Sequence, residues 1–581
     1  MKHTCHIAAL LAAAASLQCS RPPTASSGAN RYIDSKVCAA CHSRIFEAYR
    51  HTGMARSFYA PPGDSATSPL FYHKPSDTWF RITRHSDGIY QRRWQIGYQG
   101  GEENIEEVKV DYVMGSGNHV RTYLHRTVRG TLIELPLAWY AERGGQWALN
   151  PGYDSERWPS HRKIGYDCMF CHNAYPSIPV GHEDSGSEPV FTGALPQGID
   201  CQRCHGPGEK HVTAAQVPGA RTEDVRVTIV NPARLAPDRR LEVCMQCHLE
   251  TTSFPLPNAI RRFDRAPFSY QPGEPLTAFE LFFDHAPGTG HEGKFEIVSS
   301  AYRLRQSRCF RNSAEALTCT TCHNPHDIPH GPEAMAQYNR ACRKCHAAAF
   351  DSQVAGGKHT AATNCVGCHM PKRRTADVVH AVMTDHRILR APEVRDPLAA
   401  LPELHGKDIG YQGEVVAYYG DDALYTSVAQ LVARSNVEAG APRLEAELSR
   451  NPPRRPEPWI ELGDAWRDRK MPEKAAAAYR EALQRKPDSV LILRRLAGVT
   501  RDRSLLQQAV AIDPSDAAAW YDLGLLESGQ GRKPDALAAF AKAAALDPDM
   551  ADAQNSLGAV QAESGSAAEA EASFRAALRL D

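Results

Sequence analysis

The stretch Cys201-Gln-Arg-Cys-His-Gly-Pro-Gly-Glu-Lys-His211 places two thiols and two imidazoles within eleven residues. Sulfur and nitrogen ligands at this density can hold a metal. Two kinds of site compete for such a sequence. A Cys-x-x-Cys pair with nearby histidines can close a tetrahedral zinc site, whereas Cys-x-x-Cys-His is the attachment sequence of a c-type haem.

The five-residue pattern occurs seven times, and every Cys-x-x-Cys pair in the chain is followed directly by a histidine. The copies are Cys38–His42, Cys168–His172, Cys201–His205, Cys244–His248, Cys319–His323, Cys342–His346 and Cys365–His369, numbered here as motifs 1 to 7. A zinc ribbon has no reason to place a histidine after each pair. Haem attachment explains it, because the two thiols become thioethers and the adjacent imidazole becomes the proximal iron ligand. The sequence therefore predicts seven covalently attached haems.

The predicted attachment residues fall into two sets. The thioether residues are Cys38, Cys41, Cys168, Cys171, Cys201, Cys204, Cys244, Cys247, Cys319, Cys322, Cys342, Cys345, Cys365 and Cys368. The proximal iron ligands are His42, His172, His205, His248, His323, His346 and His369.

A proximal histidine leaves the sixth iron position open, and sixteen further histidines lie between residues 51 and 405. Most histidines in globular domains are surface or hydrogen-bonding residues, so position has to select the ligands. The expected distal ligands are His211, His326 and His359, which lie close to their motifs, and His51, His119 and His386. Further candidates are His125, six residues after His119 on a predicted strand and therefore on the same face, His161 and His380.

Two other sulfur-containing residues lie near the motifs. Met370 directly follows its own proximal histidine, so we expect it to pack on a ring edge. Cys309 precedes Cys319 by ten residues and is interpreted as a buried small apolar residue, with a thiolate near iron or substrate as the alternative.

The overall composition excludes some classes of protein. The 581 residues contain 67 Lys and Arg against 67 Asp and Glu, which gives no indication of nucleic-acid binding. Of 17 cysteines, 14 belong to the motifs, and the remaining Cys5, Cys19 and Cys309 cannot form a disulfide framework.

The N-terminus has the layout of a secretory signal: a basic start, an apolar run over residues 7–17 and polar chain after it. We expect a signal peptide over 1–19 and a linker over 20–35. The apolar run is too short to span a membrane. Covalent haem attachment occurs outside the bacterial cytoplasm, so we expect a periplasmic or otherwise extracytoplasmic protein; a lipid anchor at Cys19 is the alternative to cleavage near residues 13–15.

The expected fold is multidomain. A mostly helical, loop-rich seven-haem cytochrome domain would cover residues 36–400, with its motifs in loops and at the starts of short helices. Residues 70–153 alternate polar and apolar side chains between Gly-containing turns, which predicts an antiparallel β insertion.

The segment 456–581 carries a 34-residue period typical of tetratricopeptide repeats, which form an all-α solenoid. Trp459, Gly463, Tyr479 and Pro487 occupy repeat positions in the first unit, and Trp520 opens a later one. Residues 401–455 are interpreted as a linker and a degenerate helical hairpin. Such arrays usually bind proteins, with a scaffold or dimerisation arm as the alternative. The repeats contain no Cys or His, so we expect a chain ending near Lys407 to keep every haem.

The segments "CHGPG", "CHNPH", "CHMP" and "DHRI" are similar to multihaem c-type cytochromes related to the tetrahaem cytochrome of ammonia oxidisers. That group shares haem-packing motifs with pentahaem nitrite reductase and octahaem hydroxylamine oxidoreductase. The resemblance covers about residues 36–390 and implies mostly His/His-ligated haems in stacked pairs. The whole chain resembles bacterial fusions of such a cytochrome to tetratricopeptide repeats.

These observations predict an electron carrier that exchanges electrons with redox partner proteins, for which the repeats are the expected docking module. The alternative is an oxidoreductase acting on a small nitrogen or sulfur compound at a haem with an open coordination site. Nitrite reductases of the group often use a lysine as proximal ligand of the active haem, whereas all seven motifs here end in histidine.

Overall fold

The computed structural model describes residues 30–62, 68–154, 162–184, 186–252, 256–313, 316–391, 396–403 and 411–580. The predicted signal peptide, Cys5, Cys19, His161 and His405 lie outside these residues. The chain forms two compact units, one made of residues up to 34 and 207–229 and the other of residues 35–206 and 230–581. In the described part, no helix is long and apolar enough to cross a membrane.

The smaller unit contains α4 (Glu209–Ala215) and α5 (Thr222–Arg226). The side-chain amide of Asn30 donates to the Pro207 carbonyl at 2.7 Å, and the backbone amide of Lys210 donates to the side-chain oxygen of Asn30 at 2.9 Å. Arg31 adds an ion pair with Glu209. These contacts join the segment around residue 30 to the start of α4.

The larger unit begins with short helices and antiparallel sheets, which confirms the predicted β insertion. One sheet has the order β2-β3-β4-β5, and the other has the order β1-β6-β7-β9-β10 with β8 also paired to β7. The strands are β1 (Phe58–Tyr59), β2 (Phe71–His73), β3 (Thr78–His85), β4 (Gly88–Ile96), β5 (Glu102–Lys109), β6 (Tyr112–Met114), β7 (Val120–Arg126), β8 (Leu132–Glu134), β9 (Leu137–Tyr140) and β10 (Gln146–Leu149).

Alternation along β4 explains how the two sheets meet. Ile89, Gln91 and Trp94 are buried while their neighbours are more exposed, as expected for a strand with one face in the core. Gln91 is polar, but its amide donates to the Leu137 carbonyl at 3.1 Å and its oxygen accepts from the Leu137 amide at 2.9 Å. The buried glutamine is therefore satisfied, and it joins β4 to β9.

Two further sheets lie between and after the motifs. β11 (Ala259–Arg261), β12 (Glu280–His285) and β15 (Val415–Tyr419) form one, and β13 (Lys372–Arg374) pairs with β14 (Val382–Thr384). β15 belongs to the segment expected to be a linker and a helical hairpin. It instead pairs with every residue of β12 from Phe282 to His285. This part of the chain therefore completes a sheet of residues 35–391, which contain the seven motifs and are called the haem-motif region below.

The haem-motif region is otherwise helical with long loops. Its remaining elements are η1 (Ser35–Cys38), α1 (Ala39–Tyr49), η2 (Glu142–Gly144), α2 (Tyr166–His172), α3 (Gln202–His205), η3 (Pro232–Arg234), α6 (Pro237–His248), η4 (Leu276–Ala278), α7 (Ser300–Gln306), α8 (Arg308–Arg311), α9 (Cys319–Cys322), α10 (Gly331–Ala355) and α11 (Cys365–His369).

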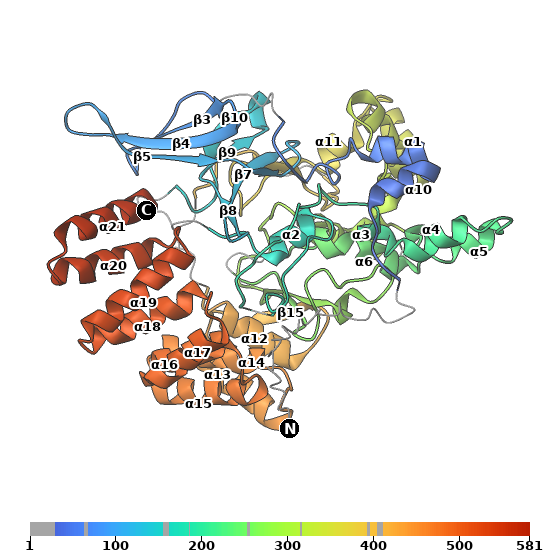
Figure 1. The fold of residues 1–581 in the computed structure, drawn as a ribbon. Helices are drawn as coiled ribbons and strands as arrows, with labels where there is room; N and C mark the ends of the chain where they lie inside the picture. Colours follow the sequence, from blue (N-terminus) through green and yellow to red (C-terminus); the bar gives the residue numbers. More distant parts are fainter. Residues whose placement is uncertain are drawn as a thin grey trace, which may run out of the picture. The chain divides into compact units, whose positions relative to one another are not determined.

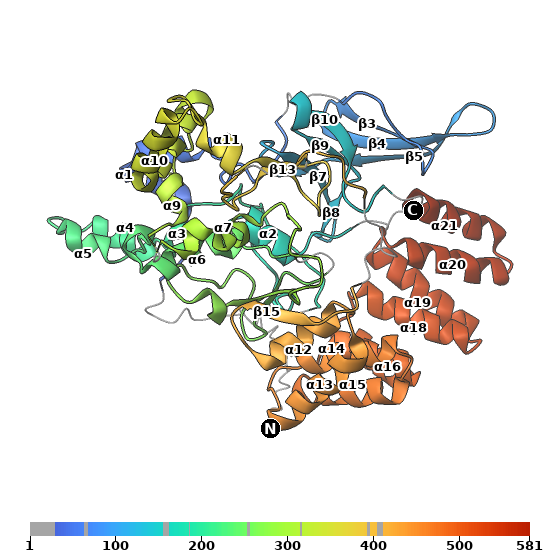
Figure 2. The same cartoon turned by 180° about the vertical axis from the view of Figure 1, so that it is seen from behind.

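The C-terminal region is an array of five helical hairpins, coloured orange to red in Figures 1 and 2. They are α12 (Ala423–Val432) with α13 (Val437–Arg450), α14 (Glu457–Asp468) with α15 (Pro472–Arg485), α16 (Val490–Thr500) with α17 (Arg503–Ile512), α18 (Ala517–Gly529) with α19 (Lys533–Leu546), and α20 (Ala551–Glu563) with α21 (Ala567–Leu580). The first pair lies in the segment where the degenerate hairpin was expected.

One glycine in each of three hairpins lets the two helices approach closely. A Cβ built on Gly524 would lie 2.6 Å from the Phe540 ring, and one on Gly558 would lie 2.9 Å from Phe574. A Cβ built on Gly463 would likewise overlap the Tyr479 ring. The 34-residue period therefore places an aromatic ring over a glycine in successive repeats.

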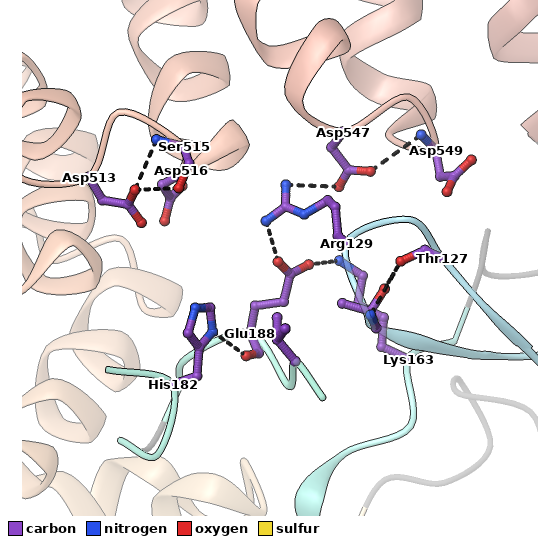
Figure 3. A network of polar contacts seen from close by, with 12 residues as sticks. Thr127, Arg129, Lys163, His182, Glu188, Asp513, Ser515, Asp516, Asp547 and Asp549 are labelled. Atoms are coloured by element: carbon purple, nitrogen blue, oxygen red, sulfur yellow. Dashed lines mark hydrogen bonds and ion pairs between the residues drawn. The ribbon is translucent and has the colours of Figure 1, made fainter. Parts of the chain in front are cut away.

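Turns between repeats contact the N-terminal part of the same unit (Figure 3). Arg129 bonds to Glu188 at 2.5 Å and approaches Asp547 at 3.7 Å. The loop carrying Glu188 also places Asp184 against Lys486. Ion pairs therefore connect the repeats to the turn between β7 and β8 and to the loop after α2.

We expect Gly524→Ala to destabilise the repeats by about 1–3 kcal/mol, because its methyl group meets the buried Phe540 ring. The matched control is Gly498→Ala in α16, where a Cβ meets nothing within 4 Å. There alanine should be neutral or stabilise by up to about 1 kcal/mol through helix propensity. Denaturant unfolding followed by circular dichroism checks both. Equal destabilisation of the two variants would contradict the close-packing account.

Candidate functional site

The seven motifs lie on helices, but not all in the predicted places. Motifs 1, 2, 3, 5 and 7 coincide with the short helices or helix starts η1–α1, α2, α3, α9 and α11. Motif 4 instead ends the twelve-residue α6, and motif 6 lies inside the 25-residue α10. The expectation of helix starts was wrong for these two. His346 departs from helical dihedral angles (φ −112°, ψ 16°), so α10 is kinked where its motif ends.

Thiols of different motifs lie in contact. Hydrogen-bonded pairs join motif 1 to 3, motif 2 to 4, motif 4 to 5 and motif 6 to 7, through Cys38/Cys201, Cys171/Cys247, Cys244/Cys319 and Cys342/Cys365. Pairing with Cys247 and burial together raise the pKa of Cys171 well above its ordinary value. Every cysteine in the described part is a free thiol. Segments as far apart in the sequence as those of Cys38 and Cys201 thus meet at their cysteines.

Three motif histidines are oriented by hydrogen bonds from Nδ1 to backbone carbonyls. The acceptors are Val230 for His205 (2.8 Å), Leu389 for His369 (2.7 Å) and Ser57 for His172 (3.4 Å). A histidine that ligates a metal through Nε2 almost always donates its other N–H in this way, which sets both tautomer and ring direction. The rings are therefore arranged to present Nε2.

Burial also favours the neutral imidazole that metal ligation needs. Burial and the neighbouring His386 lower the pKa of His323 to about 4. Burial likewise lowers the pKa of His172 and of His248. These side chains can offer a lone pair to a metal at neutral pH.

Three predicted distal histidines face motif histidines. The ring centroids are 5.9 Å apart for His205 and His326, 6.2 Å for His323 and His386, and 6.3 Å for His359 and His369. With metal–nitrogen bonds of about 2 Å, two imidazoles on opposite faces of one iron have centroids about 6 Å apart. Motifs 3, 5 and 7 thus each have an imidazole pair of the right separation.

The other predicted ligands have different surroundings. His211 donates from Nδ1 to the Val225 carbonyl at 3.1 Å within the smaller unit. His119 precedes β7 and donates to the Val382 carbonyl at 2.9 Å. In the described part, neither His119 nor the exposed His51 is stacked against a motif imidazole. The structure therefore brings together His326, His359 and His386 with motifs, and it does not do so for His51 and His119.

The further candidates also differ from one another. His125 pairs with Asp111 at 2.9 Å, whereas His119 contacts the β14 strand, so the two do not share an environment. His380 uses Nε2 to reach Glu403 at 3.2 Å. Cys309 lies in α8 and is only partly buried.

Helices around motifs 1, 5, 6 and 7 bury none of their own side chains. α10 contains Met335, Tyr338, Phe350 and Val354, yet no residue of this helix is buried, and the same holds for α1, α9 and α11. By contrast, the twelve-residue α14 buries seven. Most helices in proteins are stable because one face is packed. A large apolar group bound at these motifs would supply that packing.

A cavity of about 450 Å³ lies between α9 and α10. Its lining includes Cys322, His323, Pro325, Arg340 and Lys344. This volume is within the range of about 300–1,000 Å³ usual for cofactor sites. Among the described residues, no three or more His, Cys, Asp or Glu side chains are clustered so as to hold a metal ion.

Two functional candidates were not found from the sequence. Arg203, inside motif 3, is 1% exposed, stacks on Phe170 at 4.0 Å and has no hydrogen-bond partner at Nε or Nη1. Asp385 precedes His386 and binds Arg303. The only sequence signals were an arginine between two motif cysteines and an Asp-His pair, neither of which reveals its partner.

Comparison with known proteins concerns only the C-terminal part. The tetratricopeptide-repeat family model matches residues 430–490 and 521–581, so this region consists of tetratricopeptide repeats. Such repeats indicate a protein-interaction module. None of the curated proteins is detectably similar in sequence.

Several solved structures are similar to about a quarter of the chain. One is MamA, at 22% identity over 28% of this chain and 96% of that chain, with a TM-score of 0.25. MamA from Desulfovibrio magneticus RS-1 is 23% identical over 28% and 96%, with a TM-score of 0.25. YrrB, described as a TPR protein with an unusual peptide-binding site, is 19% identical over 28% and 87%, with a TM-score of 0.24.

Proposed function

We propose that this protein is an exported c-type cytochrome that binds seven haems covalently and transfers electrons between partner proteins. The observation that carries the proposal is the coincidence of seven Cys-x-x-Cys-His motifs with three imidazole pairs about 6 Å apart. A bound haem supplies an iron that changes its charge by one electron. The chain supplies the thiols, the axial imidazoles and their spacing.

The contacts between motifs support an electron path that does not follow the sequence. Thiol pairs connect motifs 1 and 3, 2 and 4, 4 and 5, and 6 and 7. Cys204 of motif 3 lies near Cys247 of motif 4, and Cys322 of motif 5 lies near Cys342 of motif 6. All seven motifs therefore form one connected set, with motif 2 as a branch at motif 4.

Arg203 would change the reduction potentials of haems on this path. Its buried guanidinium lies near Cys171 and Cys247 and has no carboxylate partner in an ion pair among the described residues. A buried positive charge favours the reduced state of a nearby iron, because reduction removes one positive charge from the centre. This residue should raise the potentials of the haems at motifs 2, 3 and 4.

The mature protein should carry seven haems, which add roughly 4.3 kDa to the polypeptide. Replacing both Cys319 and Cys322 by serine should leave six haems, while the control Cys309→Ser should leave seven. Intact-protein mass spectrometry measures this, and thiol alkylation of the denatured protein should modify Cys309 but no motif cysteine. A mass with fewer than six haems, or tightly bound zinc, would overturn the proposal.

We expect α10 to fold only when haem is attached, because the polypeptide alone buries none of its side chains. In protein produced without haem attachment, hydrogen exchange should be fast over residues 331–355 and slow in α14 and α15, whose side chains pack on each other. In the holoprotein both regions should be protected. Strong protection of α10 without haem would show that haem is not its core.

The repeats are proposed to dock a partner protein. The contacts of β15 and α12 with β12 mean that a truncation meant to remove only the repeats has to end further along the chain than Lys407. A chain ending near Lys407 would lose β15, which pairs with β12, and α12, which covers Leu281 and Phe283. We therefore no longer expect that truncation to leave the haem region intact.

A chain ending at residue 452 keeps β15 and the first hairpin. We expect it to retain seven haems and an unchanged visible spectrum while losing partner association. A chain ending at residue 403 should melt at a lower temperature, because Leu281 and Phe283 become exposed. Haem stoichiometry and thermal unfolding of both truncations check this. Equal stability of the two would show that β15 contributes nothing to the haem region.

A further inference from the structure

The short segment Thr384–Leu389 contacts two motifs at once. His386 lies 6.2 Å from His323 of motif 5, measured between ring centroids. Leu389 accepts from Nδ1 of His369 at 2.7 Å, and its amide donates to the His369 carbonyl at 2.9 Å. Six residues thus carry the imidazole facing motif 5 and orient the imidazole of motif 7.

A buried ion pair holds this segment. Arg303 of α7 donates from Nε and Nη2 to the two carboxylate oxygens of Asp385, at 2.9 and 2.7 Å. Arg303 is 1% exposed and Asp385 4%. Asp385 Oδ1 also accepts from the Arg387 amide at 2.9 Å, so the carboxylate fixes the backbone just beyond His386.

Ser307 fixes the same backbone from the other side. Its hydroxyl accepts from the Ile388 amide at 2.8 Å and donates to the His386 carbonyl at 3.2 Å. The His386 ring donates from Nδ1 to the Thr384 carbonyl at 3.0 Å. Residues 303 and 307 therefore hold the peptide groups on both sides of His386, and its own ring nitrogen sets the ring direction.

Energetics favour a positioning role over a stabilising one. Taking a guanidinium and a carboxylate out of water costs about as much as their attraction returns, so a buried pair is weak support for stability. A bidentate Arg–carboxylate pair does impose a fixed geometry, which a single ammonium contact cannot. An imidazole has to be held within about 0.5 Å to remain bound to a metal opposite a second imidazole.

We propose that Asp385, clamped by Arg303, is the positioning residue that keeps His386 as the second axial ligand of the iron attached at motif 5. This inference rests on the proposed function, because it requires haem at that motif. It assigns His323 and His386 to one iron, and it gives the Asp385–Arg303 pair a role at that iron and not in the fold alone.

The test uses the full-length holoprotein with Asp385→Asn, and Asp488→Asn on the exposed surface of the repeats as the matched control. Mass spectrometry should give seven haems for both. In Asp385→Asn, electron paramagnetic resonance should show about one seventh of the ferric iron changing from low-spin to high-spin, and the reduced protein should bind one additional carbon monoxide. The control should match the unmodified protein.

Two more variants keep the outcome decisive. His386→Ala should produce the same single high-spin iron, and added imidazole should return it to low-spin. Arg303→Lys keeps the charge but loses the bidentate geometry, so it should reproduce the Asp385→Asn signal even if that variant fails to mature.

The possible failures are distinguishable. A protein without haem overturns the proposed function itself. Seven haems with no new high-spin iron in His386→Ala overturns the ligand assignment. A high-spin iron in His386→Ala but in neither Asp385→Asn nor Arg303→Lys overturns the positioning role.

Discussion

Four helices that carry motifs depend on packing that their own side chains do not provide. α1, α9, α10 and α11 carry four of the seven motifs and bury no side chain of their own. Under the proposed function, each porphyrin would serve as the apolar core against which its helix packs, so cofactor attachment and folding become one process. This constraint accounts for the loop-rich sequence between motifs, which needs only to place thiols and imidazoles around the rings.

The tetratricopeptide repeats follow the opposite principle, because neighbouring hairpins bury each other's side chains. Their first hairpin nevertheless contacts the haem-motif region, where α12 covers Leu281 and Phe283. Further along, Asp547 contacts Arg129 between β7 and β8 (Figure 3), and Lys486 contacts Asp184 in the loop after α2. A partner bound by the repeats would therefore be held close to the part of the chain that carries the seven motifs, and the proposed electron transfer to a docked protein needs such an arrangement.

Much of the fold could be predicted from local sequence. Alternation over residues 70–153 predicted the antiparallel sheets, and the 34-residue period predicted the helical hairpins, because both patterns repeat at the spacing of the structure they form. β15 could not be predicted in this way. Four of its five residues pair with a strand at least 130 positions earlier, and a single short apolar run does not reveal a distant partner.

The residues of the candidate site also fall into those that local sequence predicts and those that only the tertiary structure identifies. Covalent attachment requires fixed spacing within five residues, so the sequence alone predicts the fourteen candidate thioether cysteines and the seven candidate proximal histidines. Only the tertiary structure decided which other histidines face them, because a ligand across an iron can come from any part of the chain. It paired His205 with His326 and His323 with His386, and it placed Arg303 on Asp385. Those pairings depend on three-dimensional distance and burial, which no local pattern encodes.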